Sequence, residues 1–283
     1  MKRIARKLQY YGDRILMYWF SIKVKFSRKI GVSGEAKGKL IVSLTTYPAR
    51  WNIVHVTIES LMRQTIKPDS IVLWLSTEEA QYDNIPDNLK RLESRGLDIR
   101  FVDENLKSYK KLIYSLDCYL NCNIITCDDD VLYPKDFISG LVKASMMNPG
   151  CIVAYRCTVM SKIDNKALTP YLTWPNAGSP GPSLTLFPTG TGGILYPPGS
   201  LHSEVLNKKA FIDLCPLADD VWFKAMALIN ETKVVMVNDS SIEFPTVNGT
   251  QDSALWHENV IKNRNDEQLK KVFDFYKLYD YIG

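Results

Sequence analysis

Two groups of consecutive carboxylates are the residues of this sequence best suited to chemistry. The first, Asp128-Asp129-Asp130, directly follows a short apolar run rich in β-branched side chains at residues 124–127. Adjacent carboxylates repel one another and retain water, so such a cluster at the end of a buried strand lowers stability unless a cation lies beside it. No Lys or Arg follows until Lys135. A divalent metal with an anionic ligand therefore explains the cluster better than a salt bridge.

The second group is the pair Asp219-Asp220, which precedes the apolar residues Val221 and Trp222. The pair is placed to open a helix, where a capping aspartate holds one carboxylate rigidly while its neighbour faces a cleft. A plain helix cap without chemistry is the alternative. For the acidic triplet, the alternative is an exposed turn that caps a helix beginning near Pro134.

Alternating strands and helices must position these carboxylates. Apolar runs predict strands, and apolar residues at helical spacing predict the helices between them. Strands are expected at residues 40–44, 71–75, 99–102, 124–127, 152–155 and 234–237, and helices at residues 52–64, 86–95, 109–120, 136–147, 219–229 and 267–278. This alternation indicates an α/β fold, a Rossmann-like three-layer sandwich with a mostly parallel central sheet. Ligands bind such sheets at the carboxyl ends of the strands, where the triplet lies.

Residues 156–200 interrupt this alternation with seven prolines and many Gly, Ser and Thr. A long irregular segment inside a compact domain is more often functional than filler, and we expect it to form a mobile wall over the site. Near its end is Gly-Thr-Gly-Gly at residues 190–193, where Gly192 and Gly193 would let the backbone approach a ligand closely. A bulge or a sheet corner is the alternative.

Four motifs occur in an order that resembles a known family. They are Thr-Thr-Tyr-Pro at residues 45–48, the acidic triplet, the Gly-rich stretch, and Pro-Leu-Ala-Asp-Asp-Val-Trp at residues 216–222. The set resembles nucleotide-sugar-dependent glycosyltransferases of the GT-A fold, of the family-2-like type that builds bacterial surface polysaccharides such as capsule and lipopolysaccharide. Its order is also similar to that of fringe-like β-1,3-glycosyltransferases. The resemblance covers roughly residues 40–280. It implies inverting transfer of a sugar from a UDP-sugar to a lipid-linked or cell-surface glycan acceptor.

The resemblance also implies roles for the carboxylates. Departure of a nucleoside diphosphate builds up negative charge, which a Mn²⁺ or Mg²⁺ ion held by oxygen ligands can absorb. By resemblance, Asp128 lies near the ribose or sugar, and the metal ligand is either Asp129 or Asp130. The resemblance assigns the general base, which accepts the proton of the acceptor hydroxyl, to Asp220, with Asp219 in support.

Further candidates for donor binding flank the first and third helices. Thr45 ends the first strand, Tyr47 would stack on the base, and Arg50 would reach the diphosphate. Lys110 or Lys111 is a further candidate for the nucleotide, although such lysines are more often solvated helix residues.

Cysteines and histidines suggest little additional metal chemistry. The six cysteines form no Cys-x-x-Cys pair and no zinc-like spacing with the three histidines, so we expect free thiols in a reducing cytoplasm. Some GT-A enzymes use a late histidine as a metal ligand, and His257 is the best placed here. A polar helix residue is the alternative reading of His257.

Charge is distributed unevenly along the chain. Residues 1–30 carry nine Lys and Arg against one acid, whereas the remainder carries 26 bases and 30 acids, which argues against a nucleic-acid partner. Apolar and aromatic residues at helical spacing among these bases predict an amphipathic helix on an anionic membrane, and a helix packed on the body or on a partner subunit is the alternative. No leader peptide and no run of about 20 apolar residues is recognised. We therefore expect a peripheral protein at the inner face of the cytoplasmic membrane.

These features divide the chain. Residues 1–38 form the basic helix and a linker, and residues 39–283 form the glycosyltransferase domain. Its nucleotide-binding half spans residues 39–155, and its acceptor and catalytic half spans residues 156–283.

Two other functions are compatible with an acidic cluster on an α/β sheet. A sugar-phosphate nucleotidyltransferase normally shows a Gly-rich phosphate loop with a basic residue after its first strand, which the Thr-Thr-Tyr-Pro motif lacks. A membrane-docked scaffold that has lost activity would not need both acidic sites. A haloacid-dehalogenase phosphatase is excluded because its Asp-x-Asp motif belongs at the first strand.

Overall fold

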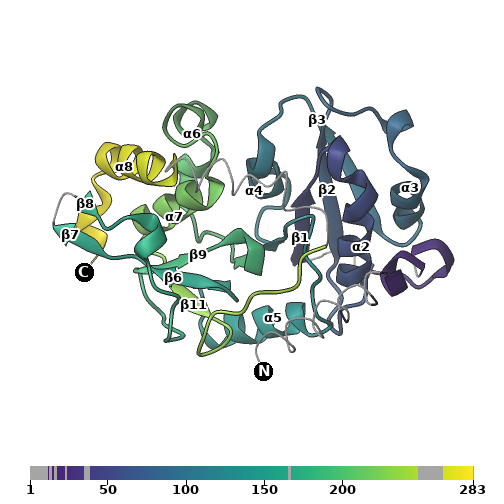
Figure 1. The fold of residues 1–283 in the computed structure, drawn as a ribbon, viewed down its shortest axis with the longest axis horizontal. Helices are drawn as coiled ribbons and strands as arrows, with labels where there is room; N and C mark the ends of the chain where they lie inside the picture. Colours follow the sequence, from purple (N-terminus) through teal and green to yellow (C-terminus); the bar gives the residue numbers. More distant parts are fainter. Residues whose placement is uncertain are drawn as a thin grey trace.

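A seven-stranded sheet runs through the protein and carries helices on both faces (Figure 1). The computed structural model describes residues 12, 15, 18–22, 24–34, 39–164, 167–247 and 264–282. Its strands are β1 (Leu40–Thr45), β2 (Ser70–Ser76), β3 (Leu97–Val102), β4 (Asn123–Thr126), β5 (Ile152–Ala154), β6 (Cys157–Val159), β7 (Lys162–Asp164), β8 (Ala167–Leu168), β9 (Leu186–Pro188), β10 (Ile194–Tyr196) and β11 (Val234–Met236). Its α-helices are α2 (Trp51–Met62), α3 (Asp87–Glu93), α4 (Lys110–Cys118), α5 (Phe137–Met147), α6 (Lys208–Leu214), α7 (Asp219–Ile229) and α8 (Arg264–Tyr276).

The sheet has the strand order β11-β5-β10-β4-β1-β2-β3. β1 pairs in parallel with β2 and β4, β2 with β3, and β5 with β11, whereas β10 pairs antiparallel with both β4 and β5. The predicted mostly parallel α/β sheet is confirmed. All six strands expected from the sequence belong to it. The apolar runs of the central strands suit burial on both faces, whereas the edge strand β3 carries Asp98 and Arg100.

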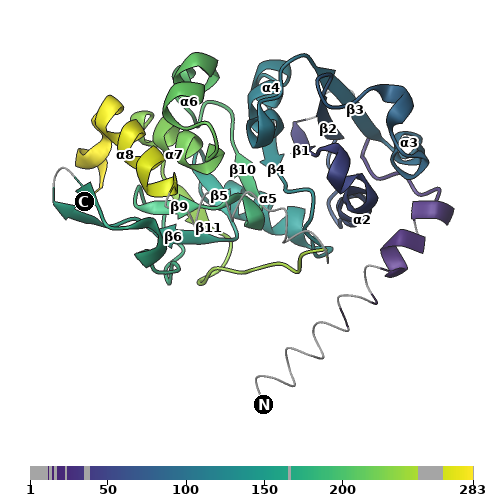
Figure 2. The same cartoon turned by 45° about the horizontal axis from the view of Figure 1, so that its top comes forward.

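Side chains alternate between two cores, one on each face of the sheet. Along β5, Ile152 and Ala154 join the core formed with α4, α7 and α8, while Val153 joins the core formed with α2, α3 and α5. Along β10, Tyr196 joins the first of these cores and Leu195 joins the second. Figure 2 shows the separation of α4 and α7 from α2. The three-layer arrangement therefore follows from the two-residue period of the strands.

Two local expectations are wrong. The segment 156–200 is not uniformly irregular, because it contains two small antiparallel sheets, β6 with β9 and β7 with β8. Pro134 does not open a helix: α5 begins at Phe137. The carbonyl of Pro134 instead accepts hydrogen bonds from the N–H of Phe137 and from the side chain of Gln64, so the residues before α5 form a turn.

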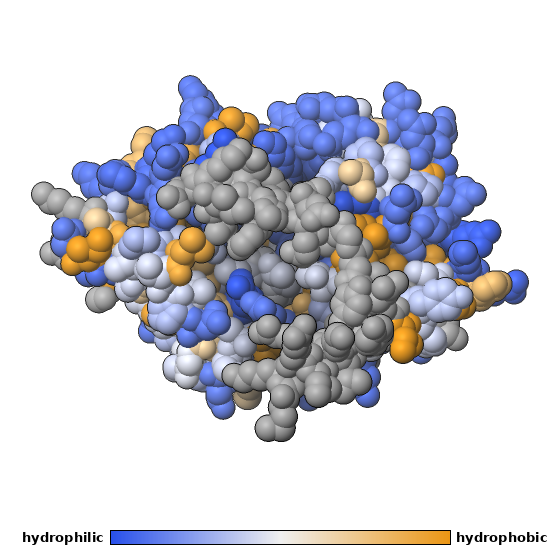
Figure 3. Space-filling view, viewed as in Figure 1, coloured by the Kyte–Doolittle hydropathy of each residue, from blue (hydrophilic) through white to orange (hydrophobic). Residues whose placement is uncertain are grey.

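Most of the basic segment at residues 1–30 lies outside the described residues, and so does His257. Residues 18–22 and 24–26 are helical. Among the described residues, no helix combines the length and apolarity needed to cross a bilayer. On the face seen in Figure 3, hydrophilic residues (blue) dominate the area over α3 and α4, and hydrophobic residues appear as small scattered groups.

Candidate functional site

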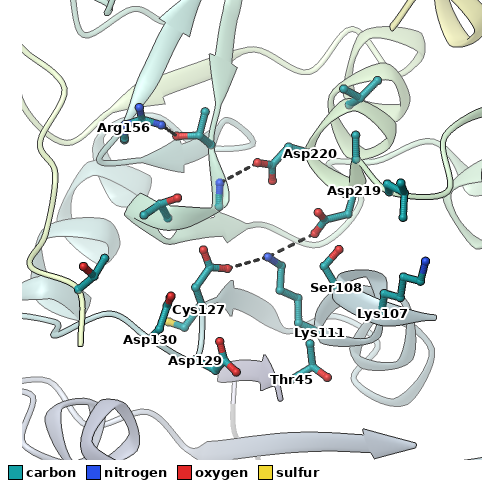
Figure 4. A pocket seen from close by; sticks show the side chains of 18 of the residues that line it. Thr45, Lys107, Ser108, Lys111, Cys127, Asp129, Asp130, Arg156, Asp219 and Asp220 are labelled. Carbon is teal, nitrogen blue, oxygen red and sulfur yellow. Dashed lines mark hydrogen bonds and ion pairs between the residues drawn. The ribbon is translucent and has the colours of Figure 1, made fainter. Parts of the chain in front are cut away.

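A cleft of about 1020 Å³ lies at the carboxyl ends of the parallel strands (Figure 4). β10 runs against its neighbours, so the turn before it reaches the same edge, and the first turn of α7 lies opposite. Nine of the predicted site residues line this cleft: Thr45, Tyr47, Arg50, Lys110, Asp128, Asp129, Asp130, Asp219 and Asp220. The remaining two, Gly192 and Gly193, are not among its lining residues.

Asp129 is held by residues that follow β1. Its carboxylate accepts hydrogen bonds from Thr46 Oγ1 at 2.6 Å and from Arg50 Nη1 at 2.5 Å. Arg50 also lies 3.2 Å from Asp130 Oδ2. Burial raises the pKa of Asp129, and Arg50 and Thr46 oppose that rise. The same carboxylates hold the pKa of Arg50 above its usual range despite burial.

The backbone of the acidic triplet is equally fixed. The N–H of Asp128 donates to the hydroxyl of Tyr133, the carbonyl of Asp129 accepts from Thr57, and the carbonyl of Asp130 accepts from Val247. Such anchoring keeps three neighbouring carboxylates pointing in set directions.

Lys111 joins the two acidic groups. Its ammonium lies 2.9 Å from Asp128 Oδ1 and 3.3 Å from Asp219 Oδ2 (Figure 4). Burial alone would lower the pKa of Lys111, but Asp128, Asp219 and Asp220 outweigh it and hold the pKa well above its usual value. Lys111 is thus a charged group enclosed by carboxylates from both halves of the chain.

The expectation that no salt bridge serves the triplet is therefore wrong. Arg50 and Lys111 neutralise it, and both are distant in sequence from residues 128–130. Ser115, four residues further along α4, is buried against Ser43 of β1, so the face of α4 that carries Lys111 points at the sheet.

Lys110 points to the other end of the cleft. It contacts Glu79 at 3.3 Å and Asn105 at 3.1 Å, and with Lys107 and Ser108 these residues line that end. Glu79 and Asn105 were not expected from the sequence, since neither belongs to a motif. They follow β2 and β3, which places them at the carboxyl edge of the sheet.

Asp219 and Asp220 occupy the first turn of α7, as expected, but neither caps it. Ala218 holds the N-cap position, and no side chain caps the helix. Asp220 Oδ2 instead accepts a hydrogen bond from the N–H of Gly190 at 3.0 Å. Burial, and then the neighbouring Asp219, raise the pKa of Asp220 to about 7, against the opposing effect of Lys111.

Gly190 is the glycine at the cleft. A Cβ there would lie 3.1 Å from Lys111 Nζ, 3.3 Å from Asp220 Oδ1 and 3.5 Å from Asp128 Oδ1. The glycine that approaches the cleft is therefore Gly190, and not Gly192 or Gly193 as expected from the sequence. A Cβ on Gly192 would meet Arg156, and one on Gly193, whose φ is +73°, would meet Phe137, so both serve protein packing.

The residues around the end of β1 support the same region. Thr45 Oγ1 donates to the carbonyl of Trp74 on β2, which leaves the hydroxyl group engaged in the sheet. The guanidinium of Arg50 lies 5.6 Å from the centroid of the Tyr47 ring. Tyr47 therefore presents an aromatic surface beside the acidic triplet.

The carboxylates suit a hard cation only in part. Among the described residues, no three His, Cys, Asp or Glu side chains are grouped to hold a metal ion. Mg²⁺ and Mn²⁺ are commonly bound by one or two carboxylates plus substrate phosphates, which is a smaller protein donor set. The side chains of Asp128 and Asp130 are 27% and 12% exposed and each is paired with one cation, whereas Asp129 is 8% exposed and accepts hydrogen bonds from both Arg50 and Thr46. Asp128 and Asp130 fit such a site better than Asp129.

The described residues include two histidines, and neither is placed to serve as a metal ligand in the cleft. His55 bonds Asn88, and His202 accepts from the N–H of Glu204, and neither lines the cleft. All six cysteines are free thiols in the structure.

No protein-family model and no curated protein matches this sequence. Solved structures do match its fold. S. aureus TarS, residues 1–349, superposes with a TM-score of 0.50 at 12% identity over 84% of this chain and 72% of that one. The architecture is thus a GT-A-like, Rossmann-related one, as expected from the order of the motifs.

Two further matches fall just below that similarity. The mannosyltransferase PcManGT from Pyrobaculum calidifontis, solved with GDP-Man and Mn²⁺, has a TM-score of 0.49 at 15% identity, covering 97% of this chain and 80% of its own. The 4-diphosphocytidyl-2C-methyl-D-erythritol synthase from Anaerococcus prevotii has a TM-score of 0.46 at 15% identity, covering 81% of this chain and all of its own, 100%.

Proposed function

We propose that this protein is a metal-dependent glycosyltransferase that moves a sugar from a nucleotide-sugar, a UDP-sugar by preference, to a glycan or lipid-linked acceptor. One observation carries the proposal. Asp128 Oδ1 and Asp220 Oδ1 both lie within 3.5 Å of the Cβ position of Gly190, so the acidic triplet and the acidic pair share one cleft. A leaving diphosphate and an attacking hydroxyl need this proximity.

The donor is assigned to the half of the cleft built by residues 39–155. Tyr47 stacks on the base, and Lys110, Asn105 and Lys107 line the space around the nucleoside. Arg50 and Lys111 supply positive charge for the diphosphate once it displaces their carboxylate partners in part. Thr45 supports the sheet edge beneath the donor.

We propose Asp130 and Asp128 as the ligands of a Mg²⁺ or Mn²⁺ ion. This pair takes the place of the alternatives Asp129 and Asp130 that the sequence left open. The ion would neutralise the charge that develops on the departing diphosphate. Asp129 keeps Arg50 in place instead.

Asp220 is the proposed general base. Its carboxylate accepts the proton of the acceptor hydroxyl as that oxygen forms a bond to the anomeric carbon. The bond from this carbon to the diphosphate oxygen breaks, and its electron pair leaves with the diphosphate. A pKa raised to about 7 by burial and by Asp219 suits this step, because a base near neutrality is both ionised and proton-accepting. Displacement in one step inverts the anomeric centre.

The N-terminal helix supports a peripheral site on an anionic membrane, which we propose to be the inner face of the cytoplasmic membrane. Phe20 and Val24 pack on the body, with exposures of 7% and 2%. The same segment also carries a row of exposed apolar side chains spaced three or four residues apart. We call this the exposed apolar row: Ile15, Tyr18, Ile22 and Phe26. Together with the nine bases of residues 1–30, this apolar row fits an interfacial helix.

A donor screen tests the proposal. Purified protein is mixed with UDP-, GDP- and CMP-sugars with and without Mn²⁺, and nucleotide release is followed. We expect release from one sugar nucleotide, dependent on Mn²⁺ or Mg²⁺. Thermal unfolding with UDP and Mn²⁺, singly and together, gives a second readout, since the pair should stabilise more than either alone. A response to CTP but to no sugar nucleotide would favour a nucleotidyltransferase, and no response to any nucleotide would favour a scaffold.

A further inference from the structure

The wall of the cleft opposite the donor side has no role in the proposed donor chemistry. We call Thr158, Tyr171, Trp174 and Asn265 the distal wall. They come from β6, from the turn around Tyr171–Thr173, and from the start of α8, and all four line the cleft. This wall faces the same space as Asp220.

Two polar atoms of the distal wall are buried without a hydrogen-bond partner in the described part of the chain: Thr158 Oγ1 and Asn265 Oδ1. Asn265 is only 9% exposed. Buried polar atoms are nearly always bonded, so two unsatisfied ones on one cleft wall indicate partners supplied by a ligand. Both atoms accept hydrogen bonds, and a ligand hydroxyl is a fitting donor for each.

The distal wall includes two aromatic side chains, Tyr171 and Trp174, which pack with Phe187. The Tyr171 ring packs 5.1 Å from Trp174 and 5.8 Å from Phe187, measured between centroids. The indole N–H of Trp174 is bonded to Thr169, so its ring is fixed in orientation. A flat aromatic surface with a few directed polar groups is the usual composition of a small-ligand site.

The start of α8 sets the geometry of this wall. The N–H of Tyr171 donates to Asp266 Oδ1 at 2.7 Å, which ties the turn to the residue next to Asn265. Tyr171 and Asp220 line the same cleft, so a ligand that packs on the distal wall lies in the space that the proposed base faces.

Charge on the wall disfavours an anionic ligand. Arg156, the nearest cation, already lies 3.3 Å from Glu243 and bonds Thr189 Oγ1 at 2.8 Å. The four residues of the distal wall are uncharged, and the carboxylates of Asp219 and Asp220 line the same cleft. Repulsion between like charges thus opposes a phosphate or carboxylate beside Asp220.

We propose that the distal wall binds the acceptor and that the acceptor presents a neutral saccharide there. Asn265 and Thr158 each accept a hydrogen bond from a ring hydroxyl, Tyr171 packs against the apolar face of the ring, and a third hydroxyl meets Asp220. This inference rests on the proposed glycosyltransferase activity and deepens it by naming the class of acceptor.

Saturation-transfer NMR with the full chain and UDP tests the inference. The probes are p-nitrophenyl glycosides of neutral hexoses and N-acetylhexosamines, with p-nitrophenyl glucuronide and a hexose 6-phosphate as charged comparators. We expect at least one neutral glycoside to bind and to bind more tightly than either charged probe. Asn265→Ala and Thr158→Val should each weaken that binding about tenfold or more, as expected when a directed hydrogen bond to a sugar hydroxyl is lost.

Matched variants make the result interpretable. Asn84→Ala removes an amide from an exposed turn and should leave glycoside binding unchanged, and Thr158→Ser, which keeps the hydroxyl, should retain most of it. Stabilisation by UDP with Mn²⁺ should be equal in all variants, which shows that they fold and that the donor side is intact.

Three outcomes would overturn the inference. They are the absence of binding by every neutral glycoside, binding that Asn265→Ala and Thr158→Val leave unchanged, and tighter binding of a charged probe. None of these affects donor hydrolysis or UDP binding, so failure of the acceptor assignment is distinguishable from failure of the proposed activity.

Discussion

The ammonium group of Lys111 lies 3.3 Å from a carboxylate oxygen of Asp219, although the two residues belong to opposite halves of the chain. The same ammonium bonds Asp128, so one buried cation fixes the distance between the two acidic groups of the cleft. Asp219 Oδ2 has no hydrogen bond within the described residues, and the attraction of Lys111 is its compensation. This bridge makes the geometry of the site sensitive to one side chain.

Replacing Lys111 with Met should lower both turnover and stability. Removing one partner of a buried charge cluster typically costs about 3–5 kcal/mol of unfolding free energy, because the remaining charges stay buried. Misplacement of reacting groups by about 1 Å can cost about 100-fold in rate. Urea unfolding and steady-state kinetics measure the two effects. Lys143→Met, on the exposed side of α5, is the matched control, and equal behaviour of the two variants would remove Lys111 from the site.

Asp220→Asn should reduce transfer by about 10²–10⁴-fold while leaving UDP affinity unchanged. The amide oxygen can still accept from the N–H of Gly190, so the local structure should persist. Turnover with the preferred donor and calorimetric titration with UDP give the two readouts. Asp213→Asn, on exposed α6, should behave as wild type. Wild-type turnover in Asp220→Asn would exclude it as the base.

The rate should rise with pH through neutrality. Asp220 must be ionised to accept a proton, and burial with Asp219 raises its pKa to about 7. We expect kcat/KM to fall about tenfold per unit below pH 6 and to level off above pH 8. A profile that levels off already near pH 5 would contradict the assignment, since an unperturbed aspartate has a pKa of about 3.9.

Lys224 should make the protein more stable at alkaline pH. It is 2% exposed and donates to the carbonyl of Leu184, and burial lowers its pKa to about 7, with a small opposing effect of Cys157. Between this value and the usual lysine pKa, the unfolded chain binds the extra proton, so stability rises with pH from about 7 to about 10. Lys224→Met should flatten that rise and stabilise the fold at pH 7 by roughly 1–4 kcal/mol. Urea unfolding at pH 7, 8.5 and 10 tests this, and parallel curves for both proteins would refute it.

Polar replacement of the exposed apolar row should release the protein from anionic vesicles. Ile22 and Phe26 are 37% and 77% exposed, so their change to Ser should leave folding intact. Each buried CH₂ contributes about 0.8 kcal/mol to membrane binding, so the double variant should bind at least about tenfold more weakly. Sedimentation with phosphatidylglycerol vesicles measures binding, and neutral vesicles and Ile163→Ser in the β7–β8 hairpin are the controls. If wild type instead elutes as a dimer and ignores vesicles, the row is a contact between copies.

Local pattern was enough to predict six of the seven strands of the sheet, but not β10, which lies in the segment expected to be irregular. The run before Asp128 and the acidic start of α7 were both located to within a residue or two, because buried strands and helix starts are encoded by neighbouring residues. The carboxyl-edge rule placed the triplet at a ligand-binding edge, and the resemblance to GT-A glycosyltransferases implied that the acidic pair shares the same cleft.

What the sequence did not reveal depends on long-range contacts. Arg50 and Lys111 come from other elements of the fold and form ion pairs with the triplet. The spacing of these residues along the chain does not indicate that they are close in space. Gly190 was missed in favour of Gly192 and Gly193 because all three share one motif, and only packing against Arg156 and Phe137 separates them. Asn265 belongs to no motif at all.

The antiparallel strand β10 belongs to the second half of the chain, residues 156–283, but pairs with strands of the first half, residues 39–155. It is inserted between β4 and β5, both of which precede it in sequence. A protein truncated after residue 155 would leave the backbone groups of β4 open along one side, an edge prone to pair with other chains and aggregate. Expression of the first piece alone should therefore yield insoluble material, and chimaeras with other proteins of this fold would have to exchange β10 together with its partners.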